Sequence, residues 1–155
     1  MRRPHVSRGP ALLTLALFAL VAGACTGKNP AEKIAGAALS NGTAHVEVTG
    51  GVELSFDAPL ERAQVGDVVT VFVYRSESND LFSITGLGIE GPTKTSNTLP
   101  LVVSSGDLSA TSAEGECTIE VKHGDDNAED GTATCTNLDS NQGTISLEAT
   151  FSASP

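Results

Sequence analysis

From Thr43 to the C-terminus, apolar side chains recur at every second position, in short segments separated by glycine, proline, asparagine and aspartate. Successive side chains of a β-strand point to opposite sides, so a period of two is typical of strands with one buried face. The clearest example is TAHVEVTGGVELSF (43–56), in which two alternating runs flank Gly50-Gly51. We expect these two runs to form a β-hairpin whose apolar residues share one face.

The remainder of the chain predicts further strands, and no convincing long helix follows position 43. VVTVFVYR (68–75) is rich in β-branched and aromatic residues on both faces, which favours a central strand buried on each side. ECTIEV, GTATCTNL and TISLEATFSA predict a C-terminal meander of three strands. About eight or nine strands favour an all-β fold, an antiparallel β-sandwich, and a closed barrel is the alternative because periodicity does not distinguish the two.

The N-terminal residues have the composition of a targeting segment. Three arginines within the first eight residues precede an apolar run from Ala11 to Val21, interrupted by Thr14. This run is too short to cross a bilayer as a helix, which needs about 20 apolar residues, but it suits a signal peptide. We expect three segments: a signal peptide (1–24), a tether with a short helix (25–42) and the β-domain (43–155).

Removal of the targeting segment leaves a strongly acidic chain. All 19 acidic residues lie after position 24, together with only six basic residues, which gives a net charge of −13. Such a surface repels phosphate backbones, so no nucleic acid is expected as a partner, and it disfavours flat electrostatic binding to anionic lipid. The simplest consequence of the charge is solubility.

The three cysteines divide into one beside the targeting segment and two within the β-domain. Cys25 follows the small residues that end the targeting segment, whereas Cys117 and Cys135 lie in alternating segments. An exported domain with two cysteines usually oxidises them together. We predict a Cys117–Cys135 disulfide between neighbouring strands of a hairpin, which stabilises by about 3 kcal/mol in the chain-entropy model.

The segment HGDDNAEDG (123–131) gathers carboxylates between these two cysteines. Calcium needs several oxygen ligands that converge from one loop, so this segment is a weak candidate for a calcium site. The EF-hand pattern is not met, because Ala128 stands at the third position counted from Asp126. We favour an exposed hairpin loop with solvated charges and no bound metal. The candidate ligands are Asp125, Asp126, Glu129 and Asp130.

The histidines give no local signature of catalysis. His45 and His123, the two that follow the targeting segment, form no HxH or HExxH pair, and the chain has no GxSxG motif. His45 alternates with Ala44 and Val46, which places it on the outer face of its strand. We expect no enzymatic activity, and a hydrolase assembled from distant residues is the weakest alternative.

The residues Ala22-Gly23-Ala24-Cys25 resemble the lipobox of bacterial lipoproteins. In such proteins small residues precede a cysteine that becomes the first residue and carries a thioether-linked diacylglycerol. The position three before the cysteine is Ala22 where leucine is usual, and Ala-Gly-Ala also fits an ordinary secretion signal. The resemblance implies a lipid anchor on Cys25, and secretion of the chain is the alternative.

The segment from Cys117 to the C-terminus resembles small exported lipoproteins of actinomycete-type bacteria, a family without an established activity. The likeness rests on CTIEV, GTATC and the terminal TF strand. It implies a disulfide-stapled β-domain at the cell envelope. Separately from this resemblance, we expect no cofactor.

We therefore expect an exported lipoprotein, anchored to the outer face of the bacterial cell membrane, whose domain binds an envelope protein or a small ligand. One alternative is a carrier of an apolar ligand such as a lipid, and another is a calcium-stabilised module. The carrier requires unfilled space within the fold. Its pocket would be lined by Val69, Val71, Phe72 and Ile84.

Overall fold

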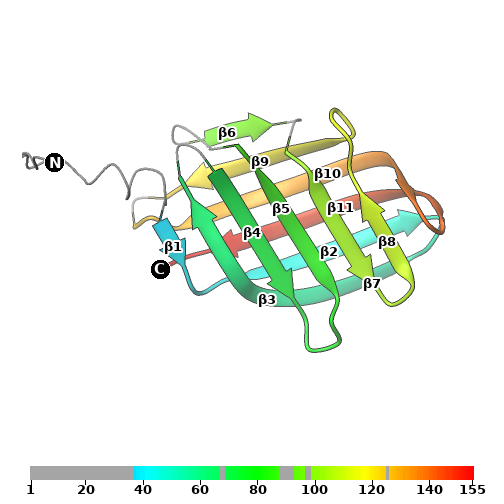
Figure 1. The fold of residues 1–155 in the computed structure, drawn as a ribbon, viewed down its shortest axis with the longest axis horizontal. Helices are drawn as coiled ribbons and strands as arrows, with labels where there is room; N and C mark the ends of the chain where they lie inside the picture. Colours follow the sequence, from blue (N-terminus) through cyan, green and yellow to red (C-terminus); the bar gives the residue numbers. More distant parts are fainter. Residues whose placement is uncertain (1–36, 67–68, 88–92, 97–98, 125) are drawn as a thin grey trace, which may run out of the picture.

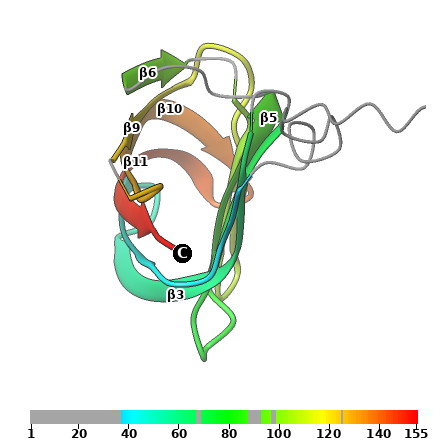
Figure 2. The ribbon, with the colours of Figure 1, turned by 90° about the vertical axis from the view of Figure 1, so that its left-hand side faces the viewer.

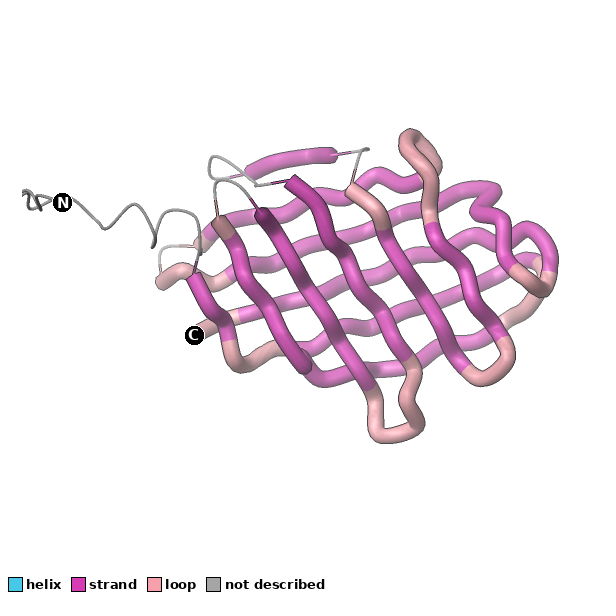
Figure 3. Tube along the Cα trace, viewed as in Figure 1, coloured by secondary structure: helices cyan, strands magenta, loops and turns pink. Residues whose placement is uncertain are grey.

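A computed structural model describes residues 37–66, 69–87, 93–96, 99–124 and 126–155, which form eleven β-strands and no helix (Figures 1 and 3). The alternating apolar residues fix which face of each strand is buried, as the sequence predicts. The strands are β1 (Ala37–Leu39), β2 (Thr43–Gly50), β3 (Leu54–Val65), β4 (Val69–Arg75), β5 (Leu81–Leu87), β6 (Thr93–Ser96), β7 (Leu101–Ser105), β8 (Leu108–Thr111), β9 (Cys117–His123), β10 (Glu129–Ser140) and β11 (Gly143–Ala153).

Eight of these strands form a closed antiparallel barrel. In the order β2-β3-β4-β5-β7-β8-β10-β11 each strand is hydrogen-bonded to the next, and β11 pairs with β2 to close the ring. Figure 1 shows β4, β5, β7 and β8 in front of β2, β9, β10 and β11, and Figure 2 shows the same two groups of strands from the side. The all-β expectation is confirmed.

The expected sandwich is wrong, and the alternative of a closed barrel is confirmed. Two twelve-residue strands, β3 and β10, connect the front and back strands by hydrogen bonds. The start of β3 pairs with β2 and its end with β4, beyond a register shift at Leu60/Arg62. On β10 a second shift lies between Cys135 and Leu138, after which Ser140 pairs with Ala110 of β8. Such irregularities bend a strand, so one strand can belong to both sides.

Three short or peripheral strands extend this ring. β9 pairs with the first half of β10, and β6 pairs with the other edge of β9. β1 pairs with β3 through Ala37↔Val65 and Leu39↔Ala63. The signal peptide, Cys25 and most of the segment expected to hold a short helix lie outside the described residues. The last part of that segment, Ala37–Leu39, is a strand.

An aromatic cluster fills the interior of the barrel. Phe151 of β11 packs on Phe72, Tyr74 and Phe82 with ring centroids 5.2, 6.1 and 6.0 Å away. Gly131 is paired with Phe151, and a Cβ atom there would lie only 2.1 Å from Cζ of that ring, so the cluster requires glycine. The core therefore joins strands on opposite sides of the ring.

Strand β4 is central but not buried on each side, contrary to the expectation from its sequence. Thr70, Phe72 and Tyr74 point inward and are fully buried. The valines between them point outward, and Val69 is 38% exposed. A barrel wall has one inner and one outer face, so a strand with apolar residues on both faces presents valines at the surface.

Candidate functional site

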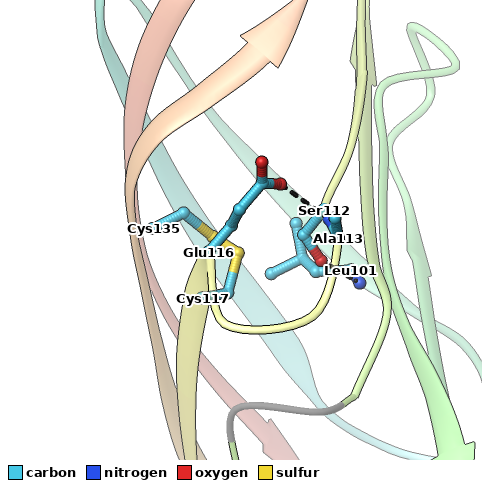
Figure 4. The surroundings of a disulfide bond; sticks show 6 residues. All are labelled: Leu101, Ser112, Ala113, Glu116, Cys117 and Cys135. Atoms are coloured by element: carbon cyan, nitrogen blue, oxygen red, sulfur yellow. Dashed lines mark hydrogen bonds between the residues drawn. A yellow bond between two sulfur atoms is a disulfide. The ribbon is translucent and has the colours of Figure 1, made fainter.

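The predicted disulfide is present. Cys117 and Cys135 are directly paired across β9 and β10, with an S–S distance of 2.02 Å, and both residues are buried. Figure 4 shows Glu116 beside the bridge, and its carboxylate accepts a hydrogen bond of 2.6 Å from the backbone N–H of Ala113. The bridge and this contact fix the turn by which the chain leaves β8 and enters β9.

The calcium candidates do not form a shared ligand set. Asp126 lies in the exposed hairpin loop between β9 and β10, and Asp125 lies outside the described residues. Glu129 and Asp130 are already in β10 and point to opposite faces, because they are consecutive residues of a strand. Among the residues that the structure describes, no group of three or more histidine, cysteine, aspartate or glutamate side chains could hold a metal ion.

Glu129 is a buried carboxylate at one end of the barrel wall. It is directly paired with His123, whose Nδ1 lies 2.5 Å from Glu129 Oε1. Burial raises the pKa of Glu129 above its ordinary value, and the contact with His123 partly opposes this. The pair closes the hairpin stem next to its loop, where Gly124 N–H donates to Ala128 O at 2.7 Å.

His45 lies on the outer face, as its position in the alternation predicts. Its Nδ1 is 2.7 Å from Asp57 Oδ1, and its Nε2 is 3.3 Å from Glu47 Oε1. The hydrogen bond to Asp57, followed by that to Glu47, raises the pKa of His45. Both ring nitrogens therefore face carboxylates. This arrangement stabilises the protonated imidazolium, whereas a catalytic base has to be unprotonated.

The residues expected to line an apolar pocket do not surround one cavity. Phe72 and Ile84 are fully buried in the barrel core, whereas Val69 and Val71 point outward from the same wall. A hollow of about 200 Å³ lies elsewhere, over β9, β10 and β11. Polar side chains predominate in its lining, which comprises Glu120, Lys122, Asp130, Gly131, Thr132, Thr150 and Phe151.

The outer surface of the barrel divides into two chemically different faces. The sequences of β4, β5, β7 and β8 contain no aspartate or glutamate, and their outward side chains include Val69, Val71, Val73 and Val102. We call these outward side chains the valine face. The outward side chains of β2, β9, β10, β11 and the first half of β3 form the acidic face. Its carboxylates are Glu47, Asp57, Glu120, Asp130, Asp139 and Glu148.

The arginines of the described domain border the valine face. Arg75 ends β4, and its Nε donates to Glu61 Oε2 at 2.7 Å. Arg62 points outward from β3 and is paired in register with Val73. The net charge is a property of the whole chain and does not reveal this face. The signal was present in the strands VTVFVYR, LFSITGL, LVVSS and LSAT, which lack acidic residues.

Comparisons with known proteins do not assign the chain to a family, since no family model, curated protein or solved structure matches it. Within the described ranges, there is no helix long and apolar enough to span a membrane.

Proposed function

We propose that this protein is a lipid-anchored lipoprotein of the bacterial cell envelope, whose β-barrel domain binds a partner at the membrane surface without catalysis. The observation that carries the proposal is the pairing of Cys117 with Cys135. Since these two cysteines are bonded to each other, neither is available to Cys25. The third cysteine then stands directly after a signal-like run, in a lipobox-like context.

Two further observations support an exported binding module. Disulfides persist in oxidising compartments, which include the bacterial cell surface. The contacts of His45 and His123 within the described residues are to carboxylates, and no hydrogen bond from either histidine to a serine hydroxyl is found there. A serine nucleophile activated by histidine would need such a bond.

Intact mass of the protein extracted from membranes tests the anchor. We expect a chain that begins at Cys25 and carries the added mass of a diacylglycerol, and we expect Cys25→Ser to release the protein from the membrane fraction. Cys117→Ala/Cys135→Ala is the matched control, because it removes two cysteines and should leave the protein at the membrane. A wild-type chain that begins at Cys25 without lipid mass and fractionates with soluble proteins would overturn the proposal.

A further inference from the structure

The valine face differs from the rest of the surface in charge as well as in polarity. Six carboxylates point outward from the strands of the acidic face, and none belongs to β4, β5, β7 or β8. On the valine face Val69 is 38% exposed, while Val71, Val73 and Val102 are partly exposed. A protein with a net charge of −13 after signal removal therefore presents one wall whose strands carry no carboxylate. Among the described residues, the neighbouring carboxylates lie in the turns at one end of this wall, Glu77 and Asp80 between β4 and β5 and Asp107 between β7 and β8, so an anionic surface would have to contact the strands beyond these turns.

Positive charge is placed at the border of this wall. Arg75 is paired with Glu61, so that arginine is largely compensated. Arg62 lies beside Val73, and no ion pair of Arg62 is found among the described residues. An arginine next to exposed aliphatic side chains suits the boundary between acyl chains and anionic headgroups.

The point where the described domain begins lies close to the same wall. Ala37 of β1 pairs with Val65 of β3, and Val65 pairs with Thr70 of β4. Two strand spacings, about 10 Å, therefore separate the start of the domain from β4. Eleven residues (26–36) connect Ala37 to Cys25, and they span at most about 40 Å. A lipid on Cys25 would keep the valine face within reach of the membrane.

We propose that the valine face rests on the anionic lipid surface in which Cys25 is anchored, with Arg62 at its edge. This inference rests on the proposed lipid anchor. The face measures about 20 Å by 20 Å, or about 400 Å², whereas a stable protein–protein interface buries about 800 Å² on each partner. Such an area is small for a self-standing dimer. It is sufficient for an anchored domain, because tethering raises the effective concentration of the surface to the millimolar range.

Site-directed spin labels on the anchored protein test this orientation. With Cys25 lipidated and Cys117 bonded to Cys135, an introduced cysteine is the one free thiol of the mature chain. We would label Val71→Cys on the valine face and Thr134→Cys on the acidic face, in vesicles of phosphatidylglycerol and phosphatidylcholine in equal parts. Accessibility to a water-soluble relaxation agent should fall at least about twofold at position 71 relative to vesicle-free protein in detergent, and stay unchanged at 134.

Charge reversal provides the second arm of the experiment. Arg62→Glu should reduce the ratio of docked to undocked protein by about fivefold or more. Lys122→Glu makes the same change of charge on the acidic face and should leave the label at 71 protected. Vesicles of phosphatidylcholine alone should protect position 71 less than the anionic vesicles do. Thermal unfolding of each variant verifies the fold, and Val69→Cys replaces Val71→Cys if that variant is unstable.

The outcomes separate the two proposals. If the protein carries lipid on Cys25 and floats with the vesicles, but the labels at 71 and 134 are equally accessible, the docking proposal is overturned and the proposed lipid anchor is retained. Protein without lipid mass that does not float overturns the anchor and the docking with it. Spin–spin broadening between labels at 71, independent of phosphatidylglycerol, would show that a second copy covers the face, which also overturns lipid docking.

Discussion

The acidic face and the valine face belong to the same barrel, are built from strands with the same alternation, and enclose one core. They differ in what fills the outward positions, which are threonine and carboxylate on one and valine, serine and threonine on the other. A net charge is an average over the molecule, whereas a partner responds to the potential within about 10 Å. The carboxylates that point outward from the acidic face have no counterpart on the strands of the valine face, and the net charge does not show this difference.

The strands that carry the two faces are joined by the barrel interior. Phe151 comes from β11, and its aromatic neighbours come from β4 and β5. The stability of the barrel therefore depends on both groups of strands, whereas the chemistry of each outer face depends on its own strands. Loss of a contact shared by both groups of strands should lower the stability of the whole barrel, whereas a change on one face should act there alone.

Phe151→Ala should have the largest effect. The ring is 4% exposed, and its removal leaves a cavity between β11 and the strands of the valine face. We expect a loss of about 3–5 kcal/mol in the free energy of unfolding, measured by urea denaturation. Thr150→Ala, its exposed neighbour, should change that free energy by less than about 0.5 kcal/mol. Equal effects of the two variants would mean that the aromatic cluster does not join the two sides.

Removal of the disulfide should have the next largest effect. The bridge lies between β9 and β10 and closes a sequence separation of 18 residues. Cys117→Ala/Cys135→Ala should lower the free energy of unfolding by about 2–4 kcal/mol, because the bridge restricts the unfolded chain. Wild-type protein unfolded in the presence of a reductant should show a similar loss. A variant as stable as the oxidised protein would contradict this prediction.

Tyr74→Phe tests a hydrogen bond across the barrel interior. The Tyr74 hydroxyl donates to the backbone oxygen of Ser152 on β11 at 3.0 Å. Its loss should cost about 1 kcal/mol, measured by the same urea denaturation.

Titration of the same residue gives an independent check. Burial raises the pKa of Tyr74, the single tyrosine of the chain. Phenolate absorbance should therefore appear above the ordinary pKa of about 10 and together with unfolding. The phenol of the unfolded chain ionises at a lower pH than the buried phenol of the folded chain. The free energy of unfolding should therefore fall as the pH rises above about 10. Ionisation near pH 10 in folded protein would contradict the burial.

His45→Gln should have the smallest effect, confined to the acidic face. Hydrogen bonds to Asp57 and then Glu47 raise the pKa of His45 in the folded state. Its stabilisation is thus fully present below the unfolded pKa of about 6.5 and is lost as the pH rises through the higher folded value. Melting temperatures of wild type and variant should differ slightly at acidic pH and converge at alkaline pH.

The NMR titration of the imidazole measures this pKa directly. Asp57→Asn should bring the midpoint of His45 closer to its ordinary value, because it removes the charge of the main partner. A wild-type midpoint at or below about 6.5 would contradict the contacts on the acidic face.

Several features were predictable because they depend on neighbours in the sequence. Gly50-Gly51 between two alternating runs predicts the β2–β3 hairpin. The cysteine count predicted the disulfide, since a bridge needs only two thiols and an exported domain. The direction in which the carboxylates of 123–131 point could not be predicted from their spacing alone. Whether Glu129 belongs to a loop or a strand decides which way it points, and it is the first residue of β10.

The alternation of the chain by itself determined the all-β class, the hairpins and most of the buried residues, because a period of two fixes which side chains share a face of a strand. Only the tertiary structure decided between sandwich and barrel. That choice depends on register shifts in β3 and β10, which let each strand pair with both sides of the ring and which change neither composition nor periodicity. The segregation of charge was likewise decided by strand order. Neighbours in the ring, such as β4 with β5 and β7 with β5, place outward residues that include no carboxylate side by side.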